Sequence, residues 1–257
     1  MALRALGRRH DCMRSARRWL SAERKVRPAL RLESGACGLP HPQKRATGGE
    51  DAWFISGNTV GVADGVGGWA RKGIDSGEYS RTLMNSAKRT VTASDKTPTP
   101  LQVLTVAHRS AQPDKAEGGA LRWQVVHETP NQCHYFNCPY QLGFGANGDK
   151  PEMGEVYDLE TQEGDVIVLG TDGLFDNLFP KQIASLLDTV LPSTPELDHH
   201  SMEKVASCIA HTAHKAAKGT KSKTPFAVAA QQAGYEYLGG KMDDITVVTS
   251  LVTSDGT

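Results

Sequence analysis

Gly164 to Leu178 reads GDVIVLGTDGLFDNL. Its apolar run VIVL is mostly β-branched and lies between glycines, which is typical of a strand buried on both faces. Two carboxylates, Asp172 and Asp176, follow in a turn where Gly173 lets the backbone approach closely. A carboxylate at the end of a rigid apolar strand is costly to desolvate unless it meets a cation or a strong donor. The stretch therefore predicts a divalent metal site, with a helix cap before Pro180–Leu191 as the alternative interpretation.

Acidic residues lie at the ends of other predicted strands as well. They are Glu50, Asp51, Asp64 and Asp243, beside the predicted strands Ala52–Ser56, Thr59–Ala63 and Ile245–Leu251. Repetition at so many strand ends is hard to explain by independent helix caps. Together with Asp172, these residues supply the oxygen ligands that hard cations prefer. Two such ions can share a water, lower its pKa and stabilise an in-line phosphoryl displacement.

Competing hydrolase motifs are missing from the sequence. It contains no GxSxG elbow, no HExxH and no GxxxxGKS loop, which excludes serine hydrolase, zinc protease and P-loop chemistry. The segment LGTDGLFD is superficially similar to the DxDG motif of the haloacid dehalogenase superfamily. That chemistry needs an aspartate nucleophile at the first position, where this chain has Gly170. An aspartyl-phosphate mechanism is therefore excluded.

The charge is balanced overall but uneven along the chain. Lysine plus arginine equals aspartate plus glutamate at 29 each, which gives no global argument for nucleic acid or a membrane. Residues 1–33 carry ten lysines or arginines, with alanine, serine and leucine but no long apolar core, which is typical of an organelle transit peptide. A basic RNA-binding helix is the alternative. The sequence predicts a transit peptide at 1–33, a linker at 34–47, a metal-binding domain at 48–252 and a tail at 253–257.

Cysteine, histidine and hydropathy patterns add little chemistry. The five cysteines form no CxxC pair, so free thiols are expected. His211 and His214 lie one turn apart on a predicted helix, and a zinc site there is a less favoured alternative. No segment reaches the ~20 apolar residues of a membrane span. We expect a soluble monomer with neither a membrane span nor a nucleic-acid partner.

Four ordered motifs carry a family resemblance. They are GGED (Gly48–Asp51), VADGVGGW (Val62–Trp69), GTDGLFDN (Gly170–Asn177) and GGKMDDIT (Gly239–Thr246). The chain resembles the metal-dependent protein phosphatases of type 2C, the PPM family. The stretches CHYFNCPYQL and GEYSRTLM resemble its organellar branch, which includes mitochondrial phosphatases linked to coenzyme Q biosynthesis and chloroplast relatives. The resemblance implies an α+β fold, an α-β-β-α sandwich of two mainly antiparallel sheets flanked by helices. Expected helices are Tyr79–Thr92, Gln182–Leu191 and Met202–Ala217.

The resemblance also implies roles for the acidic residues. The expected metal ligands are Glu50, Asp64, the Gly65 carbonyl, Asp172 and Asp243, with Asp176 for a weaker third ion. Asp64 would bridge two Mn²⁺ or Mg²⁺ ions and Asp51 would hold bound water, so both are expected to be catalytic. The activated water would hydrolyse phosphoserine or phosphothreonine without a phosphoenzyme. Expected substrates are phosphorylated organellar proteins, including those of coenzyme Q biosynthesis, in the mitochondrial matrix or alternatively the chloroplast.

Two side chains of the family pattern are replaced. Val66 stands where the family has a histidine suspected of protonating the leaving group. Ala46 stands where a phosphate-binding arginine is usual, so Lys44 or Arg45 is expected to take that role. A lysine cannot grip phosphate bidentately as arginine does.

A larger departure lies between Ala107 and Trp123. The family has a block of central strands there, and this chain has no counterpart to it. Removing central strands exposes the edges of their neighbours, so reduced stability and activity are expected. Three function classes follow: an active phosphatase, a catalytically impaired pseudophosphatase or binding protein, and a basic nucleic-acid binder fused to a structural domain.

Overall fold

The computed structural model describes most of the phosphatase-like domain and a short N-terminal strand. The described residues are 2–9, 29–67, 75–94, 123–125, 127–130, 132–142, 148–157, 159, 161–191 and 198–254. The strands are β1 (Ala2–Arg9), β2 (Leu30–Leu39), β3 (Ala52–Ser56), β4 (Thr59–Ala63), β5 (Trp123–Val125), β6 (Cys133–Tyr135), β7 (Cys138–Pro139), β8 (Val166–Gly170) and β9 (Ile245–Ser254). The helices are α1 (Ser76–Thr92), α3 (Asp172–Phe175), α4 (Pro180–Val190), α5 (His199–Ala217) and α6 (Pro225–Gln232), with 3-10 turns η1 (Pro42–Lys44) and η3 (Pro151–Met153).

Strands far apart in the sequence form the main sheet. Its order is β2-β9-β8-β1-β5, and every neighbouring pair is antiparallel. β2 pairs with β9 along its whole length, from Leu30 opposite Ser254 to Leu39 opposite Ile245. β3 and β4 form a separate antiparallel hairpin. Because β8 and β9 are antiparallel neighbours, the end of β8 lies beside the start of β9.

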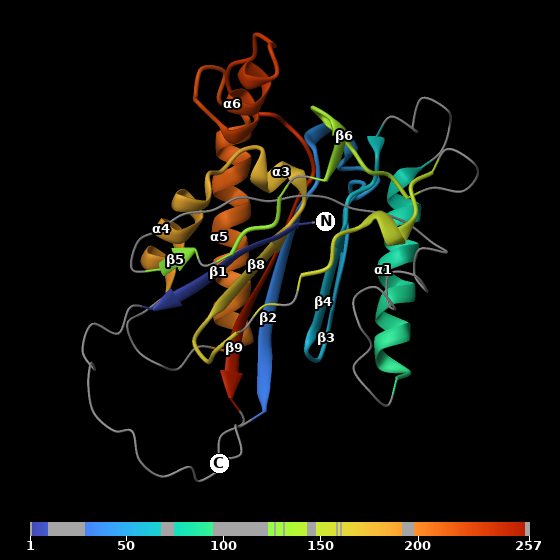
Figure 1. Cartoon of the computed structure of the whole chain (residues 1–257), viewed down its shortest axis with the longest axis vertical. Helices are drawn as coiled ribbons and strands as arrows, with labels where there is room; N and C mark the ends of the chain where they lie inside the picture. The colour runs from blue at the N-terminus through green and yellow to red at the C-terminus, as the bar shows by residue number, and fades with distance from the viewer. Residues whose placement is uncertain are drawn as a thin grey trace.

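The layers follow the predicted α-β-β-α order. α4 and α5 cover one face of the main sheet, the β3–β4 hairpin lies on the other face, and α1 covers the hairpin (Figure 1). Val62 of β4 packs against Leu169 and Val248 between the two sheets. A second apolar cluster joins the hairpin to α1. The predicted fold class is confirmed for the residues that the structure describes.

The sequence pattern of α5 explains how it seals the main sheet. Its fully buried residues recur at helical spacing and form one apolar stripe: Met202, Val205, Ala206, Ile209, Ala210 and Ala213. Asp198 caps the helix, since its carboxylate accepts a hydrogen bond from the Ser201 N–H at 2.8 Å. Gly35 of β2 lies so close that a Cβ there would stand 2.1 Å from the Glu203 nitrogen. Close packing of α5 on β2 therefore needs glycine at this position.

Helix and strand predictions hold within a few residues. α1, α4 and α5 begin two or three residues before the predicted starts, and β9 extends three residues past its predicted end. α6 and the single-turn helix α3 were not predicted. Phe179 is the N-cap of α4, so the alternative interpretation, in which an acidic residue of this stretch caps the helix, is wrong.

The predicted linker 34–47 is wrong in its first part. Residues 34–39 belong to β2, where Cys37 and Leu39 pack against the core beneath α5. The linker prediction rested on the proline and basic residues of Leu39–Ala46, whereas the glycine before them at residue 35 is required by the close approach of α5. The predicted leader 1–33 also contributes backbone to the sheet, because β1 pairs with β8 and with β5.

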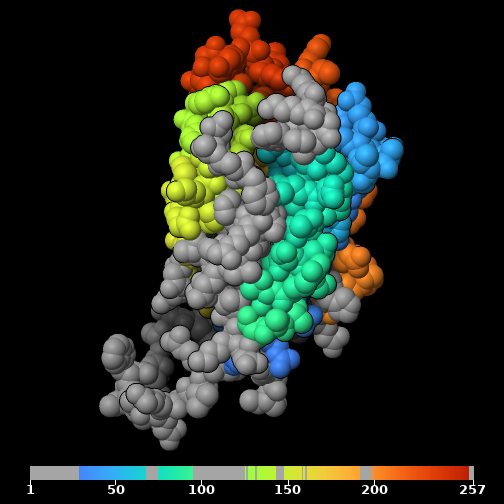
Figure 2. All heavy atoms as spheres, turned by 90° about the vertical axis from the view of Figure 1, so that its right-hand side faces the viewer, coloured from blue at the N-terminus to red at the C-terminus, as the bar shows by residue number. Residues whose placement is uncertain are grey.

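One further prediction lies outside the described residues. The predicted loss of central strands concerns the junction at residues 107–122, which the structure does not describe. Figure 2 shows α1 along one face of the molecule, with the segments around β6 and η3 beside it and α6 at one end. No helix in the described part of the chain is long and apolar enough to cross a membrane.

Candidate metal centre

The acidic residues predicted from strand ends meet at one edge of the sandwich. Asp64 follows β4, Glu50 and Asp51 precede β3, Asp172 begins α3 directly after β8 and Thr171, and Asp243 precedes β9. The antiparallel pairs β3–β4 and β8–β9 bring these four chain segments to the same side, near α3 in Figure 1.

Asp64 lies at the centre of the electrostatic repulsion. Burial raises its pKa well above the ordinary value, and the neighbouring carboxylates Asp172, Asp51 and Asp243 raise it further. Such a group of carboxylates favours a bound cation, because positive charge relieves the repulsion.

Asp51 is held by the ends of β8 and β9. Its Oδ2 accepts a hydrogen bond from the Thr171 hydroxyl at 2.8 Å, and that hydroxyl accepts one from the Thr246 N–H at 3.0 Å. Burial raises the pKa of Asp51 well above its ordinary value, and Asp244 adds to the rise. The other oxygen, Oδ1, is buried and has no hydrogen-bond partner among the described residues.

Asp244 organises the loop that carries Glu50. The Asp244 carboxylate is buried and accepts hydrogen bonds from the Glu50 N–H at 2.8 Å and from the His41 N–H. The Lys44 ammonium lies 3.1 Å from Asp244 Oδ2 and also contacts Glu50 Oε2. Although burial opposes the charge, Glu50 and Asp244 raise the pKa of Lys44 above its ordinary value. Lys44, predicted to bind phosphate, is thus in the site and paired with carboxylates.

Lys241 provides the second ammonium group of the centre. Its Nζ lies 2.6 Å from Asp172 Oδ2, 2.8 Å from Asp176 Oδ2 and 3.5 Å from Asp243 Oδ2. Despite burial, Lys241 holds the pKa of Asp172 below its ordinary value. Burial raises the pKa of Asp176 to about 6, against the opposing effect of Lys241. Burial raises the pKa of Asp243, and the negative charge of Asp172 raises it further.

Gly65 lies against Glu50. A Cβ at residue 65 would stand 2.5 Å from the Glu50 carbonyl oxygen and 2.8 Å from that of Ser76, so only glycine fits. The structure therefore brings together Glu50 and Gly65, which were both predicted as ligands of the same ion. Val66 follows and is half-buried, whereas Arg45 is exposed on the loop after η1.

The donor set suits divalent cations, although two lysines lie among the carboxylates. Asp51 Oδ1 and Asp172 Oδ1 are buried without a hydrogen-bond partner in the described part of the chain, which leaves one oxygen of each available. Within that part, no three acidic, histidine or cysteine side chains are already arranged around one ion position. The ammonium groups of Lys44 and Lys241 lie between the carboxylates instead.

Three functional residues were missed in the sequence. Thr171, Asp244 and Lys241 each contact predicted site residues, yet none was assigned a role. The doubled aspartate in GGKMDDIT was the available sequence signal for Asp244. A lysine beside acids was a weaker signal, because such pairs are usually solvated at the surface.

The chain is similar to curated plant phosphatases. It is 42% identical over 255 residues to probable protein phosphatase 2C 80 of Arabidopsis thaliana and 41% identical over 253 residues to probable protein phosphatase 2C 55, with 88% of this chain covered in each case. It spans only 60% and 52% of the length of these two relatives. With probable protein phosphatase 2C 26 of the same plant it shares 31% identity, over 89% of this chain and 86% of that protein.

Solved structures show the same fold. The photosystem II phosphatase PBCP superposes with a TM-score of 0.73 at 31% identity, over 86% of this chain and 99% of that one. The catalytic domain of the phosphatase PstP, solved with two manganese ions, superposes at 0.51 with 16% identity over 88% of this chain and all of that one, a likeness of fold alone. No family model matches the chain.

The sandwich with an acidic centre at its edge is an α+β fold of the kind seen in the photosystem II phosphatase PBCP. Identities of 31% over most of the length of probable protein phosphatase 2C 26 and of PBCP show the family. The chain belongs to the protein phosphatase 2C family.

Proposed function

We propose that this protein is a metal-dependent protein serine/threonine phosphatase. The observation that carries the proposal is the meeting of Glu50, Asp64, Asp172 and Asp243 at one edge of the sandwich, where Asp64 is surrounded by other carboxylates. Membership of the protein phosphatase 2C family supports it. Phosphoprotein hydrolysis needs compensation of the negative charge on the phosphoryl group, and an acidic site achieves this only with bound cations.

The proposed ligands divide between two ions. Glu50, Asp64 and the Gly65 carbonyl would hold one Mn²⁺ or Mg²⁺, while Asp64, Asp172 and Asp243 would hold the other. When bound, the pair would supply a more acidic water and neutralise charge on the phosphate. Asp51 would orient that water through its unpartnered Oδ1, since Oδ2 is already bonded to Thr171.

Residues outside the ligand set keep this arrangement in place. Asp244 fixes the Glu50 backbone and Thr171 fixes Asp51, so both act as positioning residues. Lys44 is the better placed of the two phosphate-binding candidates, because it is already in the site while Arg45 is exposed. Binding phosphate would require Lys44 to exchange a carboxylate partner. Val66 cannot donate a proton, so protonation of the leaving oxygen falls to another group.

Phosphatase assays with and without metal test the proposal. Purified full-length protein is incubated with a phosphothreonine peptide in Mn²⁺, Mg²⁺ or EDTA, alongside Glu50→Gln and the control Glu236→Gln at an exposed site. We expect Mn²⁺-dependent phosphate release by the wild type and by Glu236→Gln, and a large loss in Glu50→Gln. A folded protein with no metal-dependent release would favour the pseudophosphatase alternative.

We also propose an organellar location and substrate class. The arginine-rich start of the chain supports import into an organelle, and phosphorylated organellar proteins are the proposed substrates, with coenzyme Q biosynthesis as the mitochondrial case. Likeness to the photosystem II phosphatase PBCP supports the chloroplast alternative. A fluorescent fusion of the full chain, imaged with markers of both organelles, distinguishes the two. A monomer is proposed, and light scattering in solution checks it.

A further inference from the structure

Lys241 lies inside the acidic centre rather than at its rim. Its side chain is 19% exposed, and its Nζ is within 3.5 Å of carboxylate oxygens from Asp172, Asp176 and Asp243. The shortest two contacts, 2.6 and 2.8 Å, have the length of charge-assisted hydrogen bonds. One ammonium thus contacts both Asp172, expected to hold one of the two main ions, and Asp176, expected to hold a weaker third ion.

The backbone of Lys241 is fixed to the segment that carries these acids. The Lys241 N–H donates to Asn177 Oδ1 at 2.9 Å, and Asn177 Nδ2 donates to the Lys241 carbonyl at 2.7 Å. Asn177 is buried and also donates to the Gly173 carbonyl at 2.9 Å. This double clamp ties the lysine to the α3 turn, so the contact is a built feature of the fold rather than a chance surface pair.

An aromatic ring limits the other side of the ammonium. Lys241 Nζ lies 5.2 Å from the centroid of Phe226, a distance that allows a cation–π interaction. The Phe226 N–H donates to the Asp176 carbonyl at 3.0 Å, so the ring and the acid belong to one connected unit. Positive charge at this point is favoured from two directions.

The oxygens of Asp172 are divided in a way that suits two cations of different kinds. Oδ2 is bonded to Lys241, while the buried Oδ1 has no hydrogen-bond partner in the described residues. A divalent ion on Asp172 therefore has Oδ1 available. An additional divalent ion between Asp172 and Asp176 would need the same two Oδ2 oxygens that the Lys241 ammonium already contacts. The ion and the ammonium would then lie within a few ångströms of each other and repel.

We propose that the Lys241 ammonium is a resident cation that takes the place of a third divalent ion between Asp172 and Asp176, leaving a centre for two ions. The inference rests on the proposed metal centre and limits the number of divalent ions in it to two. Asp176 then serves as a counter-ion of Lys241 instead of a metal ligand. The fixed charge also holds this part of the site together before any metal binds.

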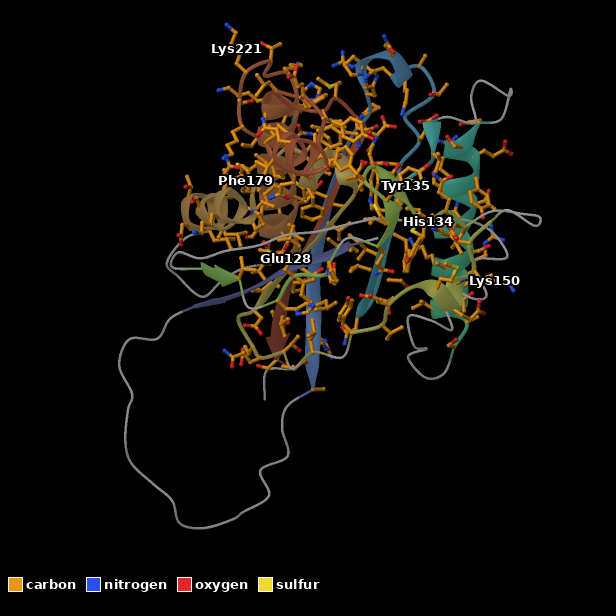
Figure 3. All side chains as sticks on the ribbon, turned by 45° about the horizontal axis from the view of Figure 1, so that its top comes forward. Glu128, His134, Tyr135, Lys150, Phe179 and Lys221 are labelled. Atoms are coloured by element: carbon orange, nitrogen blue, oxygen red, sulfur yellow. The ribbon has the colours of Figure 1, made fainter. Side chains whose placement is uncertain are left out.

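Metal counting and melting of the metal-free protein test the role of Lys241. Mn²⁺ binding is titrated by calorimetry, and melting is followed in EDTA, for wild type, Lys241→Met, Lys241→Arg, Asp176→Asn and the double variant Lys241→Met/Asp176→Asn. Lys221→Met, at an exposed lysine labelled in Figure 3, is the matched control.

We expect wild type, Lys241→Arg, Asp176→Asn and Lys221→Met to bind two Mn²⁺ ions each. Lys241→Met is expected to gain a third, weaker ion and to melt several degrees lower than wild type in EDTA, because its carboxylates lose their counter-ion. The double variant should recover part of that loss. If Lys241→Met does not fold, the number of Mn²⁺ ions bound by Asp176→Asn and the melting temperature of the double variant still test the role of Lys241.

Two results would overturn the inference: a third Mn²⁺ ion on wild type that Asp176→Asn removes, or a Lys241→Met protein that melts like wild type in EDTA. If no variant binds Mn²⁺, the proposed metal centre fails separately, and the melting order in EDTA alone decides whether Lys241 is a structural cation.

Discussion

The Thr171 hydroxyl donates a hydrogen bond to Asp51 Oδ2 over 2.8 Å, across 120 residues of sequence. The same hydroxyl accepts from the Thr246 N–H at 3.0 Å, and the Thr171 N–H donates to the Thr246 carbonyl at 3.1 Å. A fully buried threonine thus joins β8 to β9 and, through its hydroxyl, both strands to the Glu50–Asp51 segment. The geometry of the acidic centre depends on this bond.

Replacing Thr171 with valine should lower phosphatase activity while the fold is kept. Valine keeps the shape but leaves the buried Asp51 oxygen without its donor, a loss of about 1–3 kcal/mol. We expect a roughly tenfold or larger fall in kcat/KM, since about 1.4 kcal/mol of transition-state stabilisation corresponds to tenfold. Steady-state kinetics in Mn²⁺ measure it.

Thr171→Ser is the matched control, because it keeps the hydroxyl and removes only a methyl group. It should retain most of the activity. Equal loss in both variants would show that packing of the methyl group, rather than the hydrogen bond to Asp51, is what matters.

Asp64→Asn and Asp172→Asn should each abolish Mn²⁺-dependent hydrolysis without unfolding the protein. Each change removes one negative charge and preserves shape, and Asp64 is proposed to contact both ions. In EDTA, Asp64→Asn should even be slightly more stable than wild type, because it relieves repulsion from Asp172, Asp51 and Asp243. Kinetics and melting curves check both statements, and activity retained in both variants would contradict the two-ion centre.

Metal removal should lower the melting temperature of the wild type. A ligand that binds only the folded state stabilises it by about 2.7 kcal/mol at a concentration 100 times its Kd. For a domain of this size, that corresponds to a shift of roughly 5–10 °C. Melting in EDTA and then in increasing Mn²⁺ measures the shift, and Glu50→Gln should show a smaller one. Identical curves with and without Mn²⁺ would argue against a metal centre.

Gly173→Ala should displace the start of β9 and reduce activity. A Cβ at residue 173 would stand 1.9 Å from the Asp244 carbonyl oxygen, so Asp243 and Asp244 must move. A misplacement of about 1 Å in a positioned site can cost around 10²-fold in rate. Gly154→Ala is the control, because its nearest contact would be 3.2 Å away, at the Pro151 carbonyl oxygen. Kinetics of the two variants should differ by at least tenfold in kcat/KM.

Local pattern allowed the acidic centre to be predicted because strand ends are marked in the sequence. A buried strand followed by Asp-Gly is visible at Asp64 and Asp172, and antiparallel pairing then brings the ends together. Thr171 and Lys241 escaped notice because their roles depend on which distant segments meet, which no local pattern encodes. The same reason explains β2: its residue 35 is a glycine because α5 packs on it, and that contact joins segments about 170 residues apart.

The N-terminal strand is the point where prediction and structure diverge most. The leader was predicted from its basic composition, yet β1 pairs with β8 from Ala2 opposite Gly170 to Gly7 opposite Val166, with an irregularity between Arg4 and Leu6. A predicted leader and a strand in the sheet are compatible in one chain. Before import, a precursor protein still carries its leader, and in that form residues 2–9 can pair with β8.

A protein comprising residues 29–257 should therefore melt lower than the full chain and aggregate more readily. Without β1, the backbone groups of β8 on the side away from β9 lose their partners, and an open strand edge pairs with other molecules. The shortened protein keeps β2 whole, so any loss comes from residues 1–28 alone. Melting curves and light scattering compare the two forms, with both proteins at equal Mn²⁺. A lower melting temperature of 29–257 supports a structural role for β1, whereas equal melting temperatures together with a processed N-terminus in mass spectra would support the leader prediction instead.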